Sequence, residues 1–168
     1  METTVKFAKV RPEAIIPSKR DEDAGFDIYA CVEWCILKPH ETRKIATGIA
    51  SSCSPEYAFI LKERGSTGTL GIAQRCGVID SGFRGEWFVP VTNTTDKTLF
   101  IGNKESREQF INESFVDISN YIFYPTEKAI CQAMVVPVPK VTVEEIDYDD
   151  LKAIKSERGT GSIGSSNK

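Results

Sequence analysis

Residues Gly77–Gly102, "GVIDSGFRGEWFVPVTNTTDKTLFIG", show most clearly which class of fold the chain adopts. Two runs rich in β-branched and aromatic residues, "EWFVPVTN" and "TLFIG", flank a polar segment around Thr95–Lys97, which predicts two strands joined as a hairpin. Similar short runs recur along the chain between Pro, Gly, Asp, Ser and Thr: "TVKFAKV", "FDIYACV", "RKIATGIA", "YAFILKE" and "AICQAMVVPV". Many short strands without intervening amphipathic helices predict an all-β sandwich or barrel rather than a parallel α/β sheet.

Helix-like spacing is confined to two short segments, "ESREQFINESFVDI" and "DYDDLKAI". From about Val143 the composition changes to an acidic run, "EEIDYDD", and then to a tail in which Gly and Ser make up most of the last ten residues. No packed element is expected in that tail. We therefore expect a β domain over residues 1–142 and a C-terminal arm over residues 143–168, either disordered or a flexible lid.

The overall composition restricts the class of protein. The 168 residues suit one domain, and 40% apolar content with a mean hydropathy of −0.24 and no bilayer-length apolar run predict a soluble protein without membrane contact. The N-terminal "METTVKFAKVRP" lacks the features of a secretory signal, so we expect a cytoplasmic location. With 24 acidic and 21 basic residues and no basic cluster, binding to long nucleic acid is not expected.

Cysteine and histidine usage argues against several kinds of site. The five cysteines are an odd number without a C-x-x-C pair, which favours reduced, buried thiols over disulfides or a four-cysteine zinc site. The single histidine, His40, lies in an expected turn, "LKPHETRK". Ser-His-Asp catalysis and a histidine-rich metal site are therefore disfavoured.

Asp80 stands between an apolar pair and a glycine-flanked turn. If Val78 and Ile79 belong to a strand and "DSG" forms the turn, Asp80 ends the strand with its carboxylate held by the backbone of the turn. A fixed carboxylate near a bound phosphate can deprotonate water as a general base. The same residues also allow a carboxylate that only caps the turn.

Three further segments contain groups that suit phosphate chemistry. "KERGSTGTLGI" offers the guanidinium of Arg64 with hydroxyls and open backbone N–H groups, "ERGTGSIGSS" offers Arg158 among glycines, and "DAGFDIYA" places Asp27 at a strand start. Each segment alone is also explained as an ordinary turn or tail. Together, two Arg-led Gly/Ser segments and two turn carboxylates predict a site for a polyphosphate with a metal ion and water as the nucleophile.

In order, "DAGFDIYA", "RGSTG", "GVIDSGFRGE", "AICQAMV" and "RGTGSIGSS" resemble the five motifs of the trimeric dUTP diphosphatases, the dUTPases, over positions 23–166. The resemblance implies an all-β jelly roll that assembles as a homotrimer, with active sites between subunits. The C-terminal arm of one chain would close over a site built by others. The implied reaction is Mg²⁺-dependent hydrolysis of dUTP to dUMP and pyrophosphate, which keeps uracil out of DNA and supplies dUMP for thymidylate synthesis.

The resemblance also implies roles for individual residues. Asp80 would be the catalytic residue that activates water to attack the α-phosphate, and Asp27 would lie near the water shell of the metal. The implied substrate-binding residues come from four of the motifs and from one position between them: Arg64, Gly65, Ser66, Gln74, Gly77, Val78, Ile79, Phe83, Gln132, Arg158, Gly161, Ile163 and Gly164.

Within that set, the implied contacts divide by substrate group. Arg64 and Ser66 would hold phosphate oxygens, Gln132 would position the water or the α-phosphate, and Arg158 would hold the γ end. The backbone of Val78 and Ile79 would read the polar edge of uracil, Gln74 would contact the nucleotide, and the ring of Phe83 under the deoxyribose would exclude a 2′-OH.

The chain departs from the family pattern at several positions. Gly65 stands where many members have serine, Phe83 where tyrosine is more usual, and Ile163 where a phenylalanine stacks on the base. A longer connection than usual lies at about residues 103–126. We interpret it as a tolerated loop insertion, with a specialised surface as the alternative.

Two rival functions remain from the sequence. The turn "IDSGFRG" also resembles that of the dCTP deaminases, but those enzymes need a glutamate where this chain has Pro90. The other rival is a non-catalytic nucleotide-sensing protein that uses the 103–126 segment as its partner surface.

Overall fold

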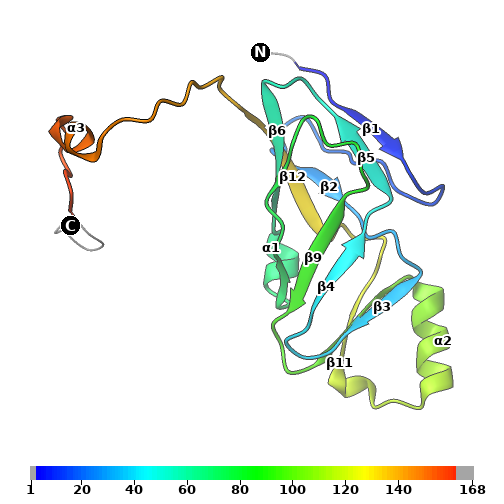
Figure 1. Cartoon of the computed structure of the whole chain (residues 1–168). Helices are drawn as coiled ribbons and strands as arrows, with labels where there is room; N and C mark the ends of the chain where they lie inside the picture. The colour runs from blue at the N-terminus through cyan, green and yellow to red at the C-terminus, as the bar shows by residue number, and fades with distance from the viewer. Residues whose placement is uncertain (1–2, 162–168) are drawn as a thin grey trace. The chain divides into compact units, whose positions relative to one another are not determined.

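Twelve short strands form the framework of the computed structural model, which describes residues 3–161 (Figure 1). The all-β prediction is confirmed. The helical elements are α1 (Gly65–Gly68), α2 (Lys104–Ser114), α3 (Tyr148–Ala153) and a 3₁₀ turn (Ile118–Asn120). The strands are β1 (Lys6–Lys9), β2 (Phe26–Ile28), β3 (Trp34–Leu37), β4 (Thr42–Ala46), β5 (Ile49–Ser52), β6 (Tyr57–Lys62), β7 (Ile72–Gln74), β8 (Val78–Ile79), β9 (Phe88–Asn93), β10 (Thr98–Gly102), β11 (Tyr121–Tyr124) and β12 (Cys131–Pro137).

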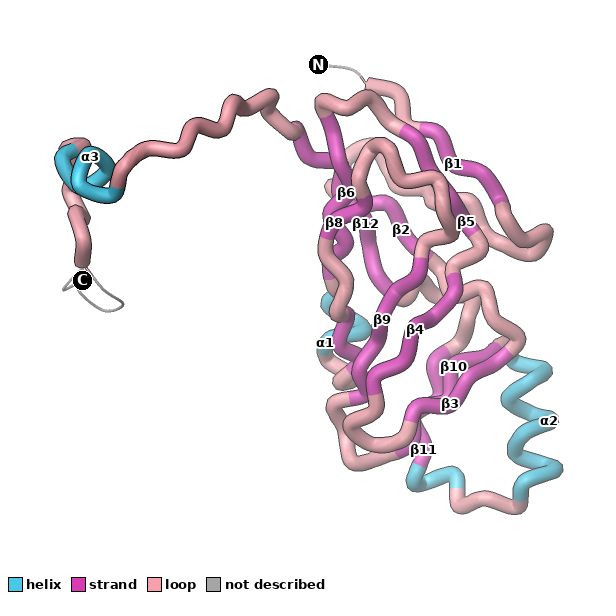
Figure 2. Tube along the Cα trace, viewed as in Figure 1, coloured by secondary structure: helices cyan, strands magenta, loops and turns pink. Residues whose placement is uncertain are grey.

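The strands pair into four small sheets with the orders β2-β12-β6-β8, β4-β9-β7, β11-β10-β3 and β1-β5 (Figure 2). The longest ladder joins β12 to β6, antiparallel, from Gln132 opposite Lys62 to Pro137 opposite Tyr57. β10 and β11 form a parallel pair, whereas the other pairs among the named strands are antiparallel. Most neighbours in these sheets are therefore distant in sequence.

The core lies between the sheets and follows from alternation along the strands. In β9 the side chains of Val89, Val91 and Asn93 are buried while their neighbours are partly exposed, as expected for a two-residue period. Trp87 and Phe59 are fully buried with ring centroids 5.0 Å apart. Burial of each such large apolar side chain stabilises the fold by about 1.5–3 kcal/mol.

The expected hairpin around Thr95–Lys97 is wrong in its pairing, although the turn itself is present. Asn93 accepts from the N–H of Thr95 at 3.1 Å and donates through Nδ2 to the C=O of Lys97 at 2.7 Å. However, β9 pairs with β4 and β7, while β10 pairs with β11 and β3. The local pattern shows a turn, but it contains no information on which distant strands occupy the edges of β9.

The connection at residues 103–126 is folded rather than a plain loop. Asn103 caps α2 by accepting from the N–H of Ser106 at 2.8 Å, and Phe110 of α2 packs against Phe100 of β10 with centroids 5.0 Å apart. β11 then joins β10 as a parallel strand. The helix-like spacing of "ESREQFINESFVDI" is confirmed as α2, and the segment completes a sheet.

The chain divides into two compact units, Met1–Val138 and Pro139–Lys168. In the described part of the second unit, Asp147 caps α3 by accepting from the N–H of Asp149 at 2.8 Å, which agrees with the helix-like spacing of "DYDDLKAI". Over residues 3–161, the helices are all too short or too polar to span a membrane.

Candidate active site

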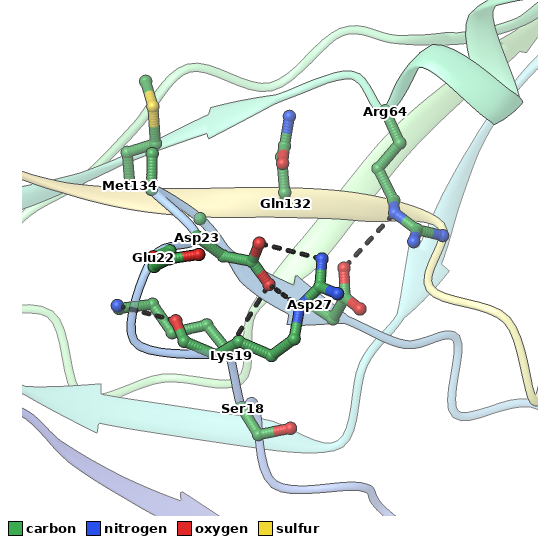
Figure 3. Close-up of a pocket in the computed structure, with 11 residues that line it drawn as sticks. Ser18, Lys19, Glu22, Asp23, Asp27, Arg64, Gln132 and Met134 are labelled. Carbon is green, nitrogen blue, oxygen red and sulfur yellow. Dashed lines mark hydrogen bonds and ion pairs between the residues drawn. The ribbon is translucent and has the colours of Figure 1, made fainter.

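A polar cavity of about 690 Å³ lies beside β2 and β12 (Figure 3). It is lined by the loop that precedes β2, by Asp27 of β2, by Arg64 at the start of α1, and by Gln132 and Met134 of β12. Asp27, Arg64 and Gln132 come from three of the segments that the sequence singled out. The fold therefore brings these segments together at one place, because β12 pairs with both β2 and β6.

Arg64 is held in place by several groups. Its Nε lies 3.2 Å from Oδ1 of Asp27, and its Nη1 donates to the C=O of Ala129 at 3.1 Å. The same carbonyl accepts from the hydroxyl of Tyr124 at 2.6 Å. Burial raises the pKa of that hydroxyl, so it stays a protonated donor. The sequence reasoning missed Tyr124, which lies in the 103–126 segment and helps to anchor Arg64.

The side-chain amide of Gln132 is oriented by one hydrogen bond and by the space beside Gly25. Its Nε2 donates to the C=O of Glu63 at 3.0 Å. A Cβ at Gly25 would lie 2.9 Å from Oε1 of Gln132, which is closer than real Cβ atoms approach. Gly25 therefore leaves the space in which the amide of Gln132 rests.

The loop before β2 adds charged groups to the cavity that the sequence reasoning did not assign. Arg20 and Asp23 form a two-point ion pair at 2.9 and 3.0 Å, and this hydrogen bonding from Arg20 lowers the pKa of Asp23. The charged run "SKRDED" directly before "AGFD" was the available signal. Three cations and three carboxylates face the cavity: Lys19, Arg20, Arg64, Glu22, Asp23 and Asp27.

Asp80 belongs to a second group of predicted site residues, a constellation separate from the one that lines the cavity. It follows β8, whose Ile79 lies opposite Phe59 of β6, and the turn is closed by the N–H of Phe83 donating to the C=O of Asp80 at 3.1 Å. The backbone carbonyl, rather than the carboxylate, makes the bond that the sequence had suggested. Over residues 3–161 the carboxylate accepts no hydrogen bond, and it is exposed to solvent.

Gln74 joins this second constellation. From β7, its Nε2 donates to the C=O of Cys76 at 2.5 Å, while the C=O of Gly77 accepts from the N–H of Leu61 at 2.8 Å. These bonds brace the segment that leads into β8, where Val78 is 59% exposed. Gln74, Gly77 and Val78 therefore form one unit with the Asp80 turn.

The two constellations lie at opposite ends of β6. Ile79 lies opposite Phe59 of β6, so the next residue, Asp80, is level with Ala58, whereas Gln132 lies opposite Lys62. Asp80 and Gln132 are therefore four residues apart along β6 and two strands apart across the sheet. With about 3.3 Å per residue and about 4.8 Å per strand, the Cα atoms of Asp80 and Gln132 are about 16 Å apart. One chain does not bring Asp80 to the cavity.

The remaining predicted residues lie near α1 or in the second unit. Gly65 and Ser66 begin α1, and a Cβ at Gly65 would meet nothing within 4 Å, so the serine of many members would fit there. In the second unit, the C=O of Arg158 accepts from the N–H of Gly161 at 3.2 Å. Ile163 and Gly164 lie outside the described residues.

All five cysteines are free thiols, as expected. Cys31 and Cys131 are buried, and the other three are partly buried. Burial raises the pKa of Cys35 to about 11 and that of Cys131 further. Such thiols are poor nucleophiles at neutral pH.

Comparison with known proteins identifies the family. The family model described as dUTPase matches residues 11–119. The chain belongs to the dUTPase family. The deoxyuridine 5′-triphosphate nucleotidohydrolase of Nautilia profundicola is 30% identical over 168 residues, which cover 98% of this chain and 99% of that protein.

Solved dUTPase structures share the fold. The Staphylococcus bacteriophage 80alpha dUTPase with dUPNHPP superposes with a TM-score of 0.73 at 23% identity, covering 97% of this chain and 98% of that one. A mutant dUTPase from phage phi11 of S. aureus, described with a structural Mg(II) ion, has a TM-score of 0.65 at 19% identity and covers 86% and 97%. The expected dUTPase-type jelly roll is confirmed.

Proposed function

We propose that the chain hydrolyses dUTP to dUMP and pyrophosphate with Mg²⁺, as a cytoplasmic homotrimer that removes dUTP before uracil enters DNA and supplies dUMP for thymidylate synthesis. The observation that carries this proposal is the position of Asp80. Its exposed carboxylate lies on a turn with the family's motif, away from the charged cavity that residues of other motifs line. The cavity lacks the proposed catalytic carboxylate, and the Asp80 turn lacks the charged groups proposed to bind phosphate.

A symmetric assembly would join the two halves. If the Asp80 turn of one copy meets the cavity of the next copy, the interface is heterologous, and a threefold rotation closes it into a ring with three identical sites. Because the two halves are about 16 Å apart within a chain, they are too distant to act on the same phosphorus without such an assembly.

In this site Asp80 would take a proton from a water molecule as it attacks the α-phosphorus in line, with pyrophosphate as the leaving group. Arg64 and Ser66 would hold phosphate oxygens, with Gly65 leaving its backbone open, and Gln132 would orient the water or the α-phosphate. Mg²⁺, coordinated mainly by the triphosphate, would neutralise charge on the phosphate oxygens.

The charge balance of the cavity fits that ligand. Its three cations and three carboxylates cancel, so a bare tetra-anion would meet as many repulsive as attractive groups. A triphosphate bound to a divalent cation carries both signs, and the partly exposed Asp27 could reach the water shell of the metal.

Selection for uracil and deoxyribose would come from the Asp80 half. Backbone groups of Gly77, Val78 and Ile79, with Gln74 behind them, would read the uracil edge, and the ring of Phe83 would leave no room for a 2′-OH. The C-terminal arm, with Arg158, would close over a neighbouring copy's site and exclude water. Gly161, Gly164 and Ile163 would complete that closure.

Pyrophosphate release from dUTP, dTTP, dCTP and UTP with Mg²⁺ tests the activity. We expect turnover of dUTP alone at low substrate concentration. Ammonia release from dCTP would instead indicate a deaminase, and tight dUTP binding without any turnover would indicate a nucleotide sensor.

Mixing two impaired variants tests the shared site. Asp80→Asn damages one half and Arg64→Ala the other, so random mixed trimers should contain intact sites in about one quarter of positions. We expect the mixture, assembled together and assayed at subsaturating dUTP, to recover about one quarter of the wild-type rate, while each variant alone stays at or below about one tenth of that rate. Absence of recovery in verified mixed trimers would contradict a site built between copies.

A further inference from the structure

Arg84 lies inside the turn that begins at Asp80. Its Nη1 donates to the C=O of Ser81 at 2.6 Å and to the C=O of Phe83 at 3.0 Å. It also reaches the C=O of Ser51, at 3.3 Å, on the neighbouring strand β5. One guanidinium thus joins two carbonyls of the turn to a strand of a different sheet.

Little else determines the shape of this turn. β8 has only two residues, and the single backbone bond that closes the turn runs from the N–H of Phe83 to the C=O of Asp80. A Cβ at Gly77 or at Gly82 would meet nothing within 4 Å, so no packed atom lies on that side of either residue. The next backbone attachment is the N–H of Trp87, which donates to the C=O of Ile49 on β5 at 2.8 Å.

The ring of Phe83 is held by a separate contact. A Cβ at Gly85 would lie 2.6 Å from Cζ of Phe83, so the ring rests directly against the backbone of Gly85. The backbone of Phe83 is bound by Arg84, and its ring is seated on Gly85. Both features act on the same turn as the Asp80 carboxylate.

We propose that Arg84 is a positioning residue for the hydrolysis, because its guanidinium holds the 80–83 turn so that the Asp80 carboxylate and the Phe83 ring project in a fixed direction. This assignment rests on the proposed function. Arg84 does not touch the reacting atoms in this assignment, and its effect passes through Asp80. Displacement of a catalytic group by about 1 Å can lower a rate by about 100-fold.

Kinetics of the full-length Arg84→Ala and Arg84→Lys variants test the assignment. We expect Arg84→Ala to lower kcat for dUTP by about 10- to 100-fold with a small change in KM. Arg84→Lys should lie between Arg84→Ala and wild type, because an ammonium can donate to some of the same carbonyls but is carried on a more flexible side chain. The matched control is Arg43→Ala, an exposed arginine of β4 that pairs with Glu41, and its kcat should equal that of wild type.

Two measurements distinguish a positioning role of Arg84 from an effect of its substitution on folding. Guanidinium ion added at concentrations far below denaturing ones should restore part of the kcat of Arg84→Ala but not that of Asp80→Asn. Thermal melts should show Arg84→Lys folded at the assay temperature, which keeps the test valid if Arg84→Ala does not fold.

The outcomes distinguish this assignment from the proposed function. An active wild type with an equally active Arg84→Ala, or a fall in kcat that follows only the folded fraction, overturns the role of Arg84 alone. A wild type that releases no pyrophosphate from dUTP overturns the proposed function and this assignment with it.

Discussion

The charged cavity and the Asp80 turn differ in how firmly they are built. In the cavity, Arg64 is bound by Asp27 and Ala129, and Gln132 by Glu63. In the turn, the carboxylate of Asp80 is exposed and the backbone depends on Arg84. A binding site benefits from groups fixed in advance, whereas a catalytic carboxylate must stay open to water and substrate.

The largest expected effect is at Asp80. Asp80→Asn removes the proposed base but keeps the shape of the side chain, so we expect kcat for dUTP to fall by about 10²–10⁴-fold with little change in KM. Steady-state pyrophosphate release measures both constants. Asp96→Asn, an exposed aspartate paired with His40, is the control and should match wild type. Equal turnover in Asp80→Asn would remove this carboxylate from the mechanism.

A smaller effect is expected at Arg64. Arg64→Ala removes the proposed charge-assisted contact to phosphate and leaves Asp27 without the partner that its ion pair provides, so binding of the substrate should weaken by about 10- to 100-fold. Calorimetry with a non-hydrolysable dUTP analogue and Mg²⁺ measures the affinity. Unchanged affinity would show that the cavity is not the phosphate site. The distinction between a cavity that binds and an Asp80 turn that catalyses would then be wrong.

Gly25→Ala should have a still smaller effect, because it displaces one side chain. The added Cβ would meet Oε1 of Gln132 at 2.9 Å, so the amide must move, and we expect kcat/KM to fall by about 10-fold. A double-mutant cycle with Gln132→Ala checks whether the effect of Gly25→Ala passes through Gln132. If Gly25 acts through Gln132, Gly25→Ala should cost much less in a Gln132→Ala background, where only the contact with the Cβ of residue 132 at 3.1 Å remains, whereas additive losses would contradict it.

The smallest effect concerns the Arg20–Asp23 pair. Because the folded pKa of Asp23 is lowered, its contribution to stability is present above the unfolded pKa and is lost as pH falls through the folded pKa. Arg20→Ala should lower the melting temperature at pH 7 by no more than about 2 °C, since the pair is exposed. At a pH well below the folded pKa of Asp23, wild type and Arg20→Ala should melt together, and a difference that persists there would rule out this carboxylate as the cause.

Local patterns predicted many elements correctly. "YAFILKE", "TLFIG" and "AICQAMVVPV" contain β6, β10 and β12, and "ESREQFINESFVDI" covers all of α2 except its first residue, Lys104. Three short strands were missed, β3, β7 and β11, because three or four residues between turns give too few repeats of the alternation to identify a strand. The β9–β10 hairpin was wrong because both edges of β9 are occupied by strands that are distant in sequence.

The site was predictable in its residue types but not in its grouping. Asp27, Arg64 and Gln132 meet at one cavity, and Asp80 lies elsewhere, which follows from the registers of β12 and β8 on β6. The order of the motifs along the chain does not contain those registers. The supporting roles of Arg84, Gly25 and Tyr124 were also hidden, since each depends on a contact with a residue from another strand or loop.

The amino-acid sequence by itself determined that the chain forms short alternating strands and carries carboxylates, arginines and glycines suited to phosphate chemistry. Side-chain alternation and residue chemistry are local properties that each segment has before it folds. Only the tertiary structure decided which strands pair, and with them the separation of Asp80 from the cavity. Pairing depends on which distant segments bury their apolar faces together, and that choice belongs to the whole chain.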